Sequence, residues 1–398
     1  MFKAIKFLKY SLFSITLCFL MLIIYSFYTV PDELYSLADE EIRVNDFYTV
    51  SYSESEASKL RQGSKQGNYT VEIKLFNAIP IKNSLLTVSD RKYVAISGQI
   101  IGLRLFTDGV LIVGIDSVET SDGTVSPGEE AGLRKGDIIC SINGIATLSS
   151  AGVNDLISQS EGRVLEVEYV RDSKRLKTQL TPALSLSEQK YRGGMWVRDS
   201  AAGIGTMTFY DKSTGEFAAL GHAVCDIDTG EILPLSNGDI VSAGITNCTK
   251  GKSGKAGELC GAFTSDTIGE LYKNTQRGIF GVLQNTASVF CADEVPVATQ
   301  SEIKKGSAQI ISTVDSTGPQ YYDIEITKIS DQDSEYKNMV IKVTDAELIE
   351  KTGGIVQGMS GSPIVQDGKL VGAVTHVLVN DPSRGYGIFI ENMLEAAA

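Results

Sequence analysis

An uninterrupted apolar run near the start constrains this chain more than any other feature. No charged residue occurs from Tyr10 to Val30, a stretch of 21 residues, and about 20 helical residues span a bilayer. Lysines precede the run, and acidic residues follow it between Asp32 and Glu41. Because positively charged flanks stay in the cytoplasm, we expect residues 1–30 to be a cytoplasmic tip and a transmembrane anchor. Residues 10–30 would cross the membrane, and the remainder would lie outside the cytoplasm.

A cleaved signal peptide is the alternative interpretation of the same run. The apolar region of a signal peptide is usually shorter and ends in small residues, whereas this one ends in the sequence IIYSFYTVP. An uncleaved anchor is therefore the favoured prediction.

Composition limits the function classes for the rest of the chain. The net charge of −13, without a clustered basic patch, argues against nucleic-acid binding. None of the six cysteines forms a C-x-x-C pair and the chain has only two histidines, so a zinc site of the usual spacing is not expected. Cys18 lies in the apolar run and leaves five cysteines outside it, so a complete disulfide framework does not follow. We expect no cofactor.

The length of 398 residues suits two or three domains, and 39 glycines with few long helical patterns favour β structure. Residues 31–93 begin as a polar stretch rich in Ser and Glu, which we interpret as a linker. They continue with the alternating sequence YTVEIKLFNAIPIKNSLLTV, which predicts strands of a short membrane-proximal β unit.

Residues 94–182 contain the sequence AGLRKGDIICSING, with tight turns at Gly132 and Gly136 and a hairpin signal at Asn143-Gly144. This segment resembles the PDZ domains of bacterial proteases. The resemblance implies that an extended peptide adds as a strand and that backbone N–H groups hold its terminal carboxylate. We expect the carboxylate loop near Gly98–Leu105. Its candidate peptide-binding residues are Gly98, Ile101, Gly102 and Leu103. A PDZ-like module that only packs against its neighbour is the alternative.

From about residue 183 to residue 398 the chain reads as short strands without a repeated βα pattern, which predicts an all-β domain of sandwich or barrel type. Within it, glycines flank Ser360 in the sequence GMSGSP. A nucleophilic serine needs such neighbours because the acyl carbon must approach the backbone closely. The N–H groups of Gly358 and Ser360 could stabilise an oxyanion. This pattern is typical of the serine of trypsin-like peptidases.

A serine nucleophile needs a base, and only His222 and His376 are available. His222 follows a small-residue strand and stands beside Gly221, a position that suits a general base. His376 follows the serine by sixteen residues and could line the cleft or be purely structural.

Several residues could complete the catalytic group. A carboxylate that orients the imidazole could come from one of four aspartates, which are Asp226, Asp228, Asp239 and Asp345. Asp345 also has the sequence context of a helix N-cap. A Ser/Lys dyad would need Lys351 or Lys369, and both are expected in surface turns.

The sequences GHAVCDIDTGE and TDAELIEKTGGIVQGMSGSPIVQDGKLVGAVTHVLVND, together with the PDZ-like segment and the anchor, resemble the stage IV sporulation protein B peptidases of spore-forming Firmicutes. The resemblance implies a trypsin-like serine endopeptidase with Ser360 as nucleophile, His222 as base and Asp345 as third member. Asp345 lies only fifteen residues before the serine, which departs from the chymotrypsin arrangement.

The resemblance also implies a biological role. Such peptidases act in the space between the two membranes of the forespore, where they cleave a membrane-bound regulator of an intramembrane protease and so trigger activation of a late sigma factor. They are also expected to cleave their own N-terminal segment, and the Ser-rich linker after Pro31 is the expected place, because unstructured chain is accessible to proteases. A non-catalytic PDZ adaptor with a peptidase-like scaffold is the rival hypothesis.

Overall fold

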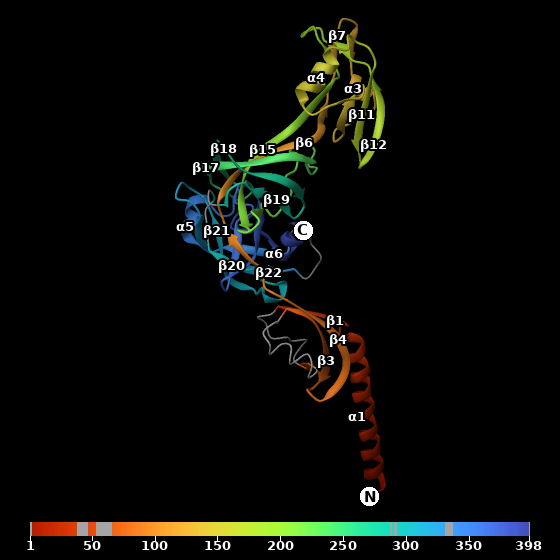
Figure 1. Cartoon of the computed structure of the whole chain (residues 1–398), viewed down its shortest axis with the longest axis vertical. Helices are drawn as coiled ribbons and strands as arrows, with labels where there is room; N and C mark the ends of the chain where they lie inside the picture. Colours follow the sequence, from red (N-terminus) through yellow and green to blue (C-terminus); the bar gives the residue numbers. More distant parts are fainter. Residues whose placement is uncertain are drawn as a thin grey trace. The chain divides into compact units, whose positions relative to one another are not determined.

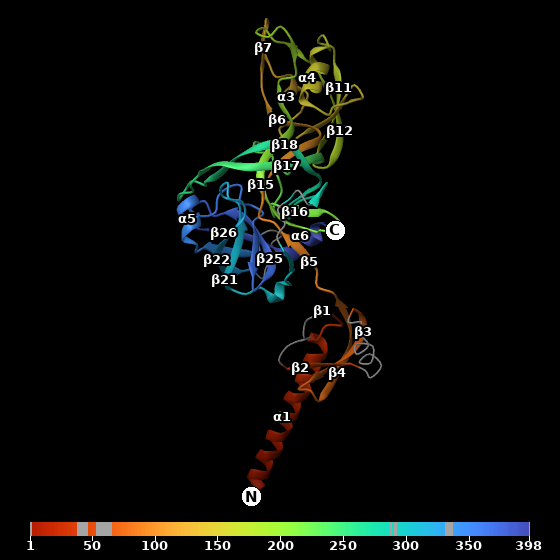
Figure 2. The ribbon, with the colours of Figure 1, turned by 60° about the vertical axis from the view of Figure 1, so that its left-hand side comes forward.

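The computed structural model describes residues 2–37, 47–52, 66–286, 289, 293–330 and 337–397. The chain divides into two compact units, Met1–Lys92 and Tyr93–Ala398. Figures 1 and 2 show both units, coloured by position in the sequence.

The first unit contains the apolar helix and a small sheet. Helix α1 (Phe2–Thr29) includes the uncharged run, and residues Tyr10–Thr29 have a mean hydropathy of 2.0. This helix has the length and composition to cross a membrane, and a signal sequence would share both properties. The sheet has the order β1-β4-β3-β2, and its strands are β1 (Glu33–Leu37), β2 (Tyr48–Tyr52), β3 (Gly67–Leu75) and β4 (Ile79–Ser89).

Strands β3 and β4 are the strands that the alternating sequence predicts. Their side chains form a small core, made of Tyr69, Val71, Leu86 and Val88. Strands β1 and β2 lie in the stretch expected to be a linker. The remainder of that stretch, residues 38–46 and 53–65, lies outside the described residues, and so does much of the expected self-cleavage region.

The second unit is built on a 12-stranded sheet, called here the long sheet. Its strands are β5 (Tyr93–Ile96), β6 (Ile100–Ile115), β9 (Ile138–Ile142), β10 (Ile145–Ala146), β11 (Leu165–Arg171), β12 (Lys174–Leu180), β15 (Met195–Tyr210), β16 (Glu216–Ala219), β17 (Leu235–Thr249), β18 (Glu258–Thr275), β19 (Gly278–Leu283) and β20 (Glu294–Pro296). Two small strand pairs accompany it, β7 (Val118–Thr120) with β8 (Gly123–Val125) and β13 (Ala183–Leu184) with β14 (Tyr191–Arg192).

Two long strands, β6 and β15, run antiparallel to each other along almost their whole length. Near Ile100 strand β6 lies between β15 and β17, whereas around Val110 it pairs with β9. Residues 107–197, which include the end of β6 and the start of β15, are called here the inserted part. It carries the helices α3 (Pro127–Glu130) and α4 (Ser150–Ser158) and has its own buried core around Ile139 and Val167. Figure 1 shows β6 and β15 reaching into it.

This arrangement differs from the predicted domain boundary at residue 94. Strand β5 and residues 100–106 of β6 pair with residues that follow position 199, so they belong to the part of the long sheet outside the inserted part. The predicted hairpin turn is present, because Ile145 pairs with Ile142 and both Asn143 and Gly144 have positive φ angles.

The expected carboxylate loop is corrected by the same pairing. Ile101, Gly102 and Leu103 lie in the middle of β6, where β15 pairs on one side and β17 on the other. Both edges of this strand are therefore occupied, and no peptide can add to it. Gly98 donates its amide to the carbonyl of Met207 and packs directly on Ile311. These four residues hold the long sheet together.

The last part of the chain forms a closed barrel in the order β21-β22-β23-β26-β25-β24. Its strands are β21 (Gly306–Ser312), β22 (Gln320–Ile329), β23 (Met339–Val343), β24 (Pro363–Gln366), β25 (Lys369–Val377) and β26 (Arg384–Phe389). The 3-10 helix η2 (Gln300–Glu302) precedes the barrel, and the helices α5 (Ala346–Thr352) and α6 (Ile390–Ala397) accompany it. The predicted all-β character of residues 183–398 is confirmed, and Figure 2 shows the barrel beside the long sheet.

Candidate active site

Ser360 lies in a turn that joins α5 to β24 and that is docked on β15. The carbonyl of Ser360 accepts a hydrogen bond from the Thr206 amide at 3.0 Å, and the Thr206 hydroxyl donates to the carbonyl of Gly358 at 2.8 Å. Gly361 has a φ of 95°, and a Cβ there would lie 2.0 Å from the Thr206 carbonyl oxygen. Only glycine permits this close approach, so the glycine after the serine is required by the contact with β15.

Backbone N–H groups in this turn alternate between bonded and open. Met359 donates to Val356, and Gly361 donates to Val374. Among the described residues, none accepts from the amides of Gly358 and Ser360. These are the two amides that the sequence predicts for an oxyanion hole.

The Ser360 hydroxyl donates to the carbonyl of Thr375 on β25, with an oxygen–oxygen distance of 2.6 Å. Its proton is therefore held by a backbone acceptor in this conformation. The hydroxyl must give up this hydrogen bond before a base can take its proton.

His222 follows β16 after a tight turn at Leu220 and Gly221, which both have positive φ angles. Its Nδ1 lies 2.8 Å from the carbonyl oxygen of Ala223. A carbonyl oxygen only accepts, so Nδ1 carries the proton of the neutral ring and Nε2 is the acceptor. Burial lowers the pKa of His222, against the opposing effect of the Ala223 carbonyl. The imidazole is thus neutral at pH 7, as a general base must be.

His376 lies against His222, with 4.7 Å between the ring centroids and 39° between the ring planes. Burial, together with the charges of His222 and Lys337, lowers the pKa of His376 to about 4. The two rings form a neutral pair at pH 7.

Both histidines, Ser360 and Gly358 line one cavity of about 760 Å³. Most of its other walls are aliphatic. They include Leu103, Leu105, Ile204, Leu220, Val224, Ile227, Ile355, Val356, Val377 and Val379. The structure therefore brings together Ser360, His222 and Gly358, which the sequence predicts as nucleophile, base and oxyanion donor.

Asp345 is not among the residues that line this cavity. Its carboxylate accepts the Leu348 amide at 2.9 Å and the Asp323 amide at 3.4 Å, so it is the N-cap of α5. The contact that a triad aspartate would make with the histidine Nδ1 is made here by the carbonyl of Ala223. Of the other candidates, Asp239 forms an ion pair with Arg104 at 3.6 Å.

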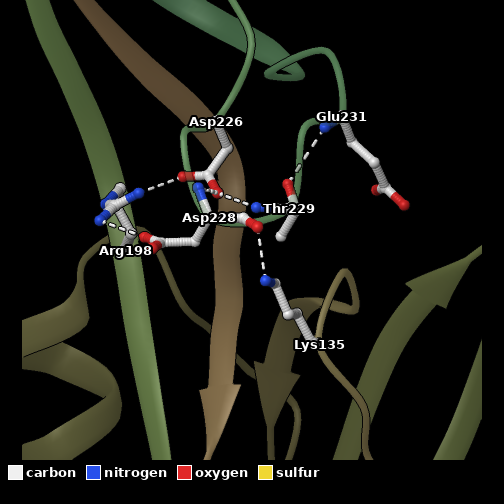
Figure 3. A network of polar contacts seen from close by, with 6 residues as sticks. All are labelled: Lys135, Arg198, Asp226, Asp228, Thr229 and Glu231. Atoms are coloured by element: carbon white, nitrogen blue, oxygen red, sulfur yellow. Dashed lines mark hydrogen bonds and ion pairs between the residues drawn. The ribbon is translucent and has the colours of Figure 1, made fainter.

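Asp226 and Asp228 belong to a polar network, shown in Figure 3. The guanidinium of Arg198 on β15 is ion-paired with both carboxylates. The Asp226 carboxylate also accepts the amides of Asp228 and Thr229, at 3.0 and 2.8 Å. Burial would raise the pKa of Asp226, but the Thr229 amide and Arg198 hold it below its ordinary value. Asp226 is therefore a charged structural anchor.

The network ties the loop after His222 to the inserted part. Lys135, between α3 and β9, donates to the carbonyl of Asp228, and Figure 3 shows its side chain reaching that loop from below. Sequence reasoning missed Arg198 because a lone arginine in a strand carries no motif.

The two lysines of a Ser/Lys dyad are engaged elsewhere. Lys351 forms ion pairs at 2.7 Å with Asp315 and Glu347, and the hydrogen bond to Asp315 raises its pKa well above the ordinary value. Lys369 is ion-paired with Glu302. A lysine base requires a lowered pKa, which excludes Lys351, and neither lysine lines the cavity that holds Ser360.

Comparison with solved structures finds chains that are similar to parts of this one. The PDZ domain of a Listeria monocytogenes SdrC-like protein is 24% identical and covers 23% of this chain and 87% of its own, with a TM-score of 0.18. The inactive form of the Rv3671c protease of M. tuberculosis is 10% identical and covers 48% and 82%, with a TM-score of 0.27. Human heparin binding protein is 14% identical and covers 48% and 77%, with a TM-score of 0.23.

Among curated sequences, a Thermotoga maritima protein named as a zinc metalloprotease is 31% identical over 101 residues. The aligned region is 25% of this chain, and the chain spans about a fifth of that relative's length (19%).

Two family models match the chain. The PDZ domain model matches residues 120–171, within the predicted PDZ segment. Together with the apolar helix and the mostly β structure of the rest of the chain, this match confirms the predicted fold class. The model described as SpoIVB peptidase S55 matches residues 189–394, which is 206 of the 398 residues and includes His222 and Ser360. The chain therefore belongs to the SpoIVB peptidase S55 family and is a serine endopeptidase.

Proposed function

We propose that Ser360 is the nucleophile of this peptidase, that His222 is its general base, and that the amides of Gly358 and Ser360 form its oxyanion hole. The observation that carries the proposal is their convergence on one cavity, with His222 neutral and its Nε2 free to accept a proton. The two open amides beside the serine support the oxyanion assignment.

The reaction begins when the Ser360 hydroxyl leaves the Thr375 carbonyl and turns to His222 Nε2. Nε2 takes the proton as Oγ bonds to the substrate carbonyl carbon, and the oxyanion is held by the two amides. The resulting imidazolium keeps its Nδ1–H bond to the Ala223 carbonyl, then protonates the leaving amine as the peptide bond breaks. Water repeats the sequence on the acyl-enzyme and regenerates the serine.

We further propose that the protein is anchored by α1, with the second unit outside the cytoplasm. The length and hydropathy of Tyr10–Thr29 support an anchor, and the lysines before the helix support this orientation. By analogy with its family, it would act between the two membranes of the developing spore. Its substrates would be a membrane-bound regulator of an intramembrane protease and its own N-terminal segment.

The test is active-site labelling of the full chain in detergent micelles with a fluorophosphonate probe, followed by mass spectrometry of the labelled peptide. Ser360→Ala and His222→Ala are labelled in parallel. We expect labelling at Ser360 in the unchanged chain and none in either variant. Labelling that survives in His222→Ala would assign the base elsewhere. No labelling of a folded chain would favour the adaptor hypothesis, in which Ser360→Ala leaves function intact.

A further inference from the structure

Strand β15 has one edge that no described strand occupies along the cavity. From Ser200 to Thr206 its pairing partner is β6, in unbroken register from Phe106 to Ile100. Its pairing with β16 begins only at Met207. Residues 200–204, the part of β15 without a second partner strand, line the cavity that holds Ser360.

The direction of the open backbone groups follows from Thr206. Its amide donates to Ser360 and its carbonyl accepts from Leu220, so both groups point away from β6. Directions alternate along a strand, and therefore the N–H and C=O groups of Ile204, Ala202 and Ser200 also point away from β6. Within the described part of the chain, none of these groups has a backbone partner.

The position of His222 decides which half of a substrate meets this edge. His222 follows β16 in the same sheet as β15, and the Leu220 amide joins the two strands. The histidine must reach the leaving amine to protonate it. The leaving half of the substrate, C-terminal to the cut bond, therefore lies on the β15 side of Ser360.

We infer that β15 binds the substrate residues that follow the scissile bond as an added antiparallel strand. The inference rests on the proposed roles of Ser360 and His222. In the N- to C-terminal direction, the substrate residues after the cut lead away from Ser360, whereas β15 leads toward Ser360. The pairing between them is therefore antiparallel. Ser200–Ile204 offer about 13 Å of edge at roughly 3.4 Å per residue, enough for four or five substrate residues.

The cavity walls define the chemistry of those residues. Leu103 and Leu105 lie on β6, directly beside this part of β15, and Ile204 lies on β15 itself. Ile227, in the loop after His222, is 89% exposed and also lines the cavity. Arg198 at the far end is neutralised by Asp226 and Asp228. The edge thus suits an extended peptide with aliphatic side chains at alternate positions.

The first experiment changes the substrate and uses the full chain in micelles. A peptide that the enzyme cuts is selected from a random decapeptide mixture by mass spectrometry. Each residue from the second one after the cut onward is then N-methylated in turn, because the nitrogen of the first residue belongs to the scissile bond. We expect kcat/KM to fall at least tenfold for methylation at alternate positions, and less than threefold at the intervening positions, which are the matched controls. Equal effects at all positions, or none, would overturn the inference.

The second experiment changes the enzyme. Ala202→Pro removes one outward N–H, and proline is tolerated on an open strand edge. We expect its kcat/KM to fall at least tenfold for the decapeptide relative to a reporter that ends in an aminocoumarin leaving group. An unchanged ratio would overturn the inference. Failure of the unchanged chain to be labelled at Ser360 would instead refute the proposed catalytic roles.

Discussion

Asp345 is the residue at which two expectations from the sequence disagree. The resemblance to the family assigns it to the catalytic group, whereas its sequence context predicts a helix cap, and the observed contacts with Leu348 and Asp323 are those of a cap. Nothing in a sequence reveals that the Ala223 carbonyl meets the His222 Nδ1, because every residue has a carbonyl.

Substitutions at Asp345 separate these two roles. We expect Asp345→Ala to lower the free energy of unfolding by about 1 kcal/mol, because the Leu348 amide loses its acceptor, whereas Asp345→Asn keeps a capping oxygen and the stability. Urea unfolding measures both values. If Asp345→Asn loses about 10⁴-fold in kcat at unchanged stability, the carboxylate acts as a triad member.

The histidine pair predicts the acid side of the pH profile. Because burial lowers the pKa of His222, kcat/KM should fall to half of its maximum at a pH below the ordinary histidine value of about 6.5. Stopped assays with the selected decapeptide from pH 4.5 to 8 would measure it. A midpoint above 6.5 would mean that a nearby anion stabilises the imidazolium.

The same pair predicts a change in stability with pH. The folded-state pKa of His376 is lowered to about 4, so the folded state binds fewer protons than the unfolded chain. The contribution of His376 to the free energy of unfolding should therefore be fully present above pH 6.5 and should decrease as the pH falls toward 4. Thermal unfolding at each pH tests this, and His376→Asn should show a smaller loss over that range.

At the scale of elements, the turn around Ser360 was predictable because its signal is local. The glycines, the serine and the following strand lie within a few residues of one another. The carboxylate loop was not predictable from its local sequence. The partners of Ile101 are Gly205 and Ser242, more than a hundred residues later, and the pairing of distant strands overrides the local pattern.

The contact between the Ser360 turn and β15 can be tested with a matched pair of glycine substitutions. Gly361→Ala would place a methyl group against Thr206 and Leu220 in a left-handed backbone conformation, and we expect a loss of about 3–5 kcal/mol. Gly368→Ala has a similar φ of 74° but no atom within 4 Å, so the conformational cost alone, about 1–2 kcal/mol, should remain. Chemical denaturation of both variants gives the difference. Equal losses would show that the β15 contact contributes nothing.

At the scale of the whole molecule, β6 and β15 make the inserted part inseparable at the predicted boundaries. Deletion of residues 94–182 would remove β5 and the whole of β6, and with β6 the strand between β15 and β17. We expect that protein to be insoluble. Replacement of residues 107–199 by Asn-Gly would join Phe106 to Ser200, which already face each other in register. We expect this second protein to be soluble with a β-rich circular dichroism spectrum, and the opposite pattern would contradict the shared-strand arrangement.

The facing positions of Phe106 and Ser200 have a further consequence for protein engineering. The chain leaves the peptidase and returns to it at adjacent points, so this position can accept a foreign module whose two ends lie close together. A chimaeric protease with its PDZ module exchanged for another peptide-recognition module would keep the Ser360 turn, the His222 ring and the open edge from Ser200 to Ile204. Recognition and cutting could then be recombined, provided that the new module replaces the contact of Lys135 with the loop after His222.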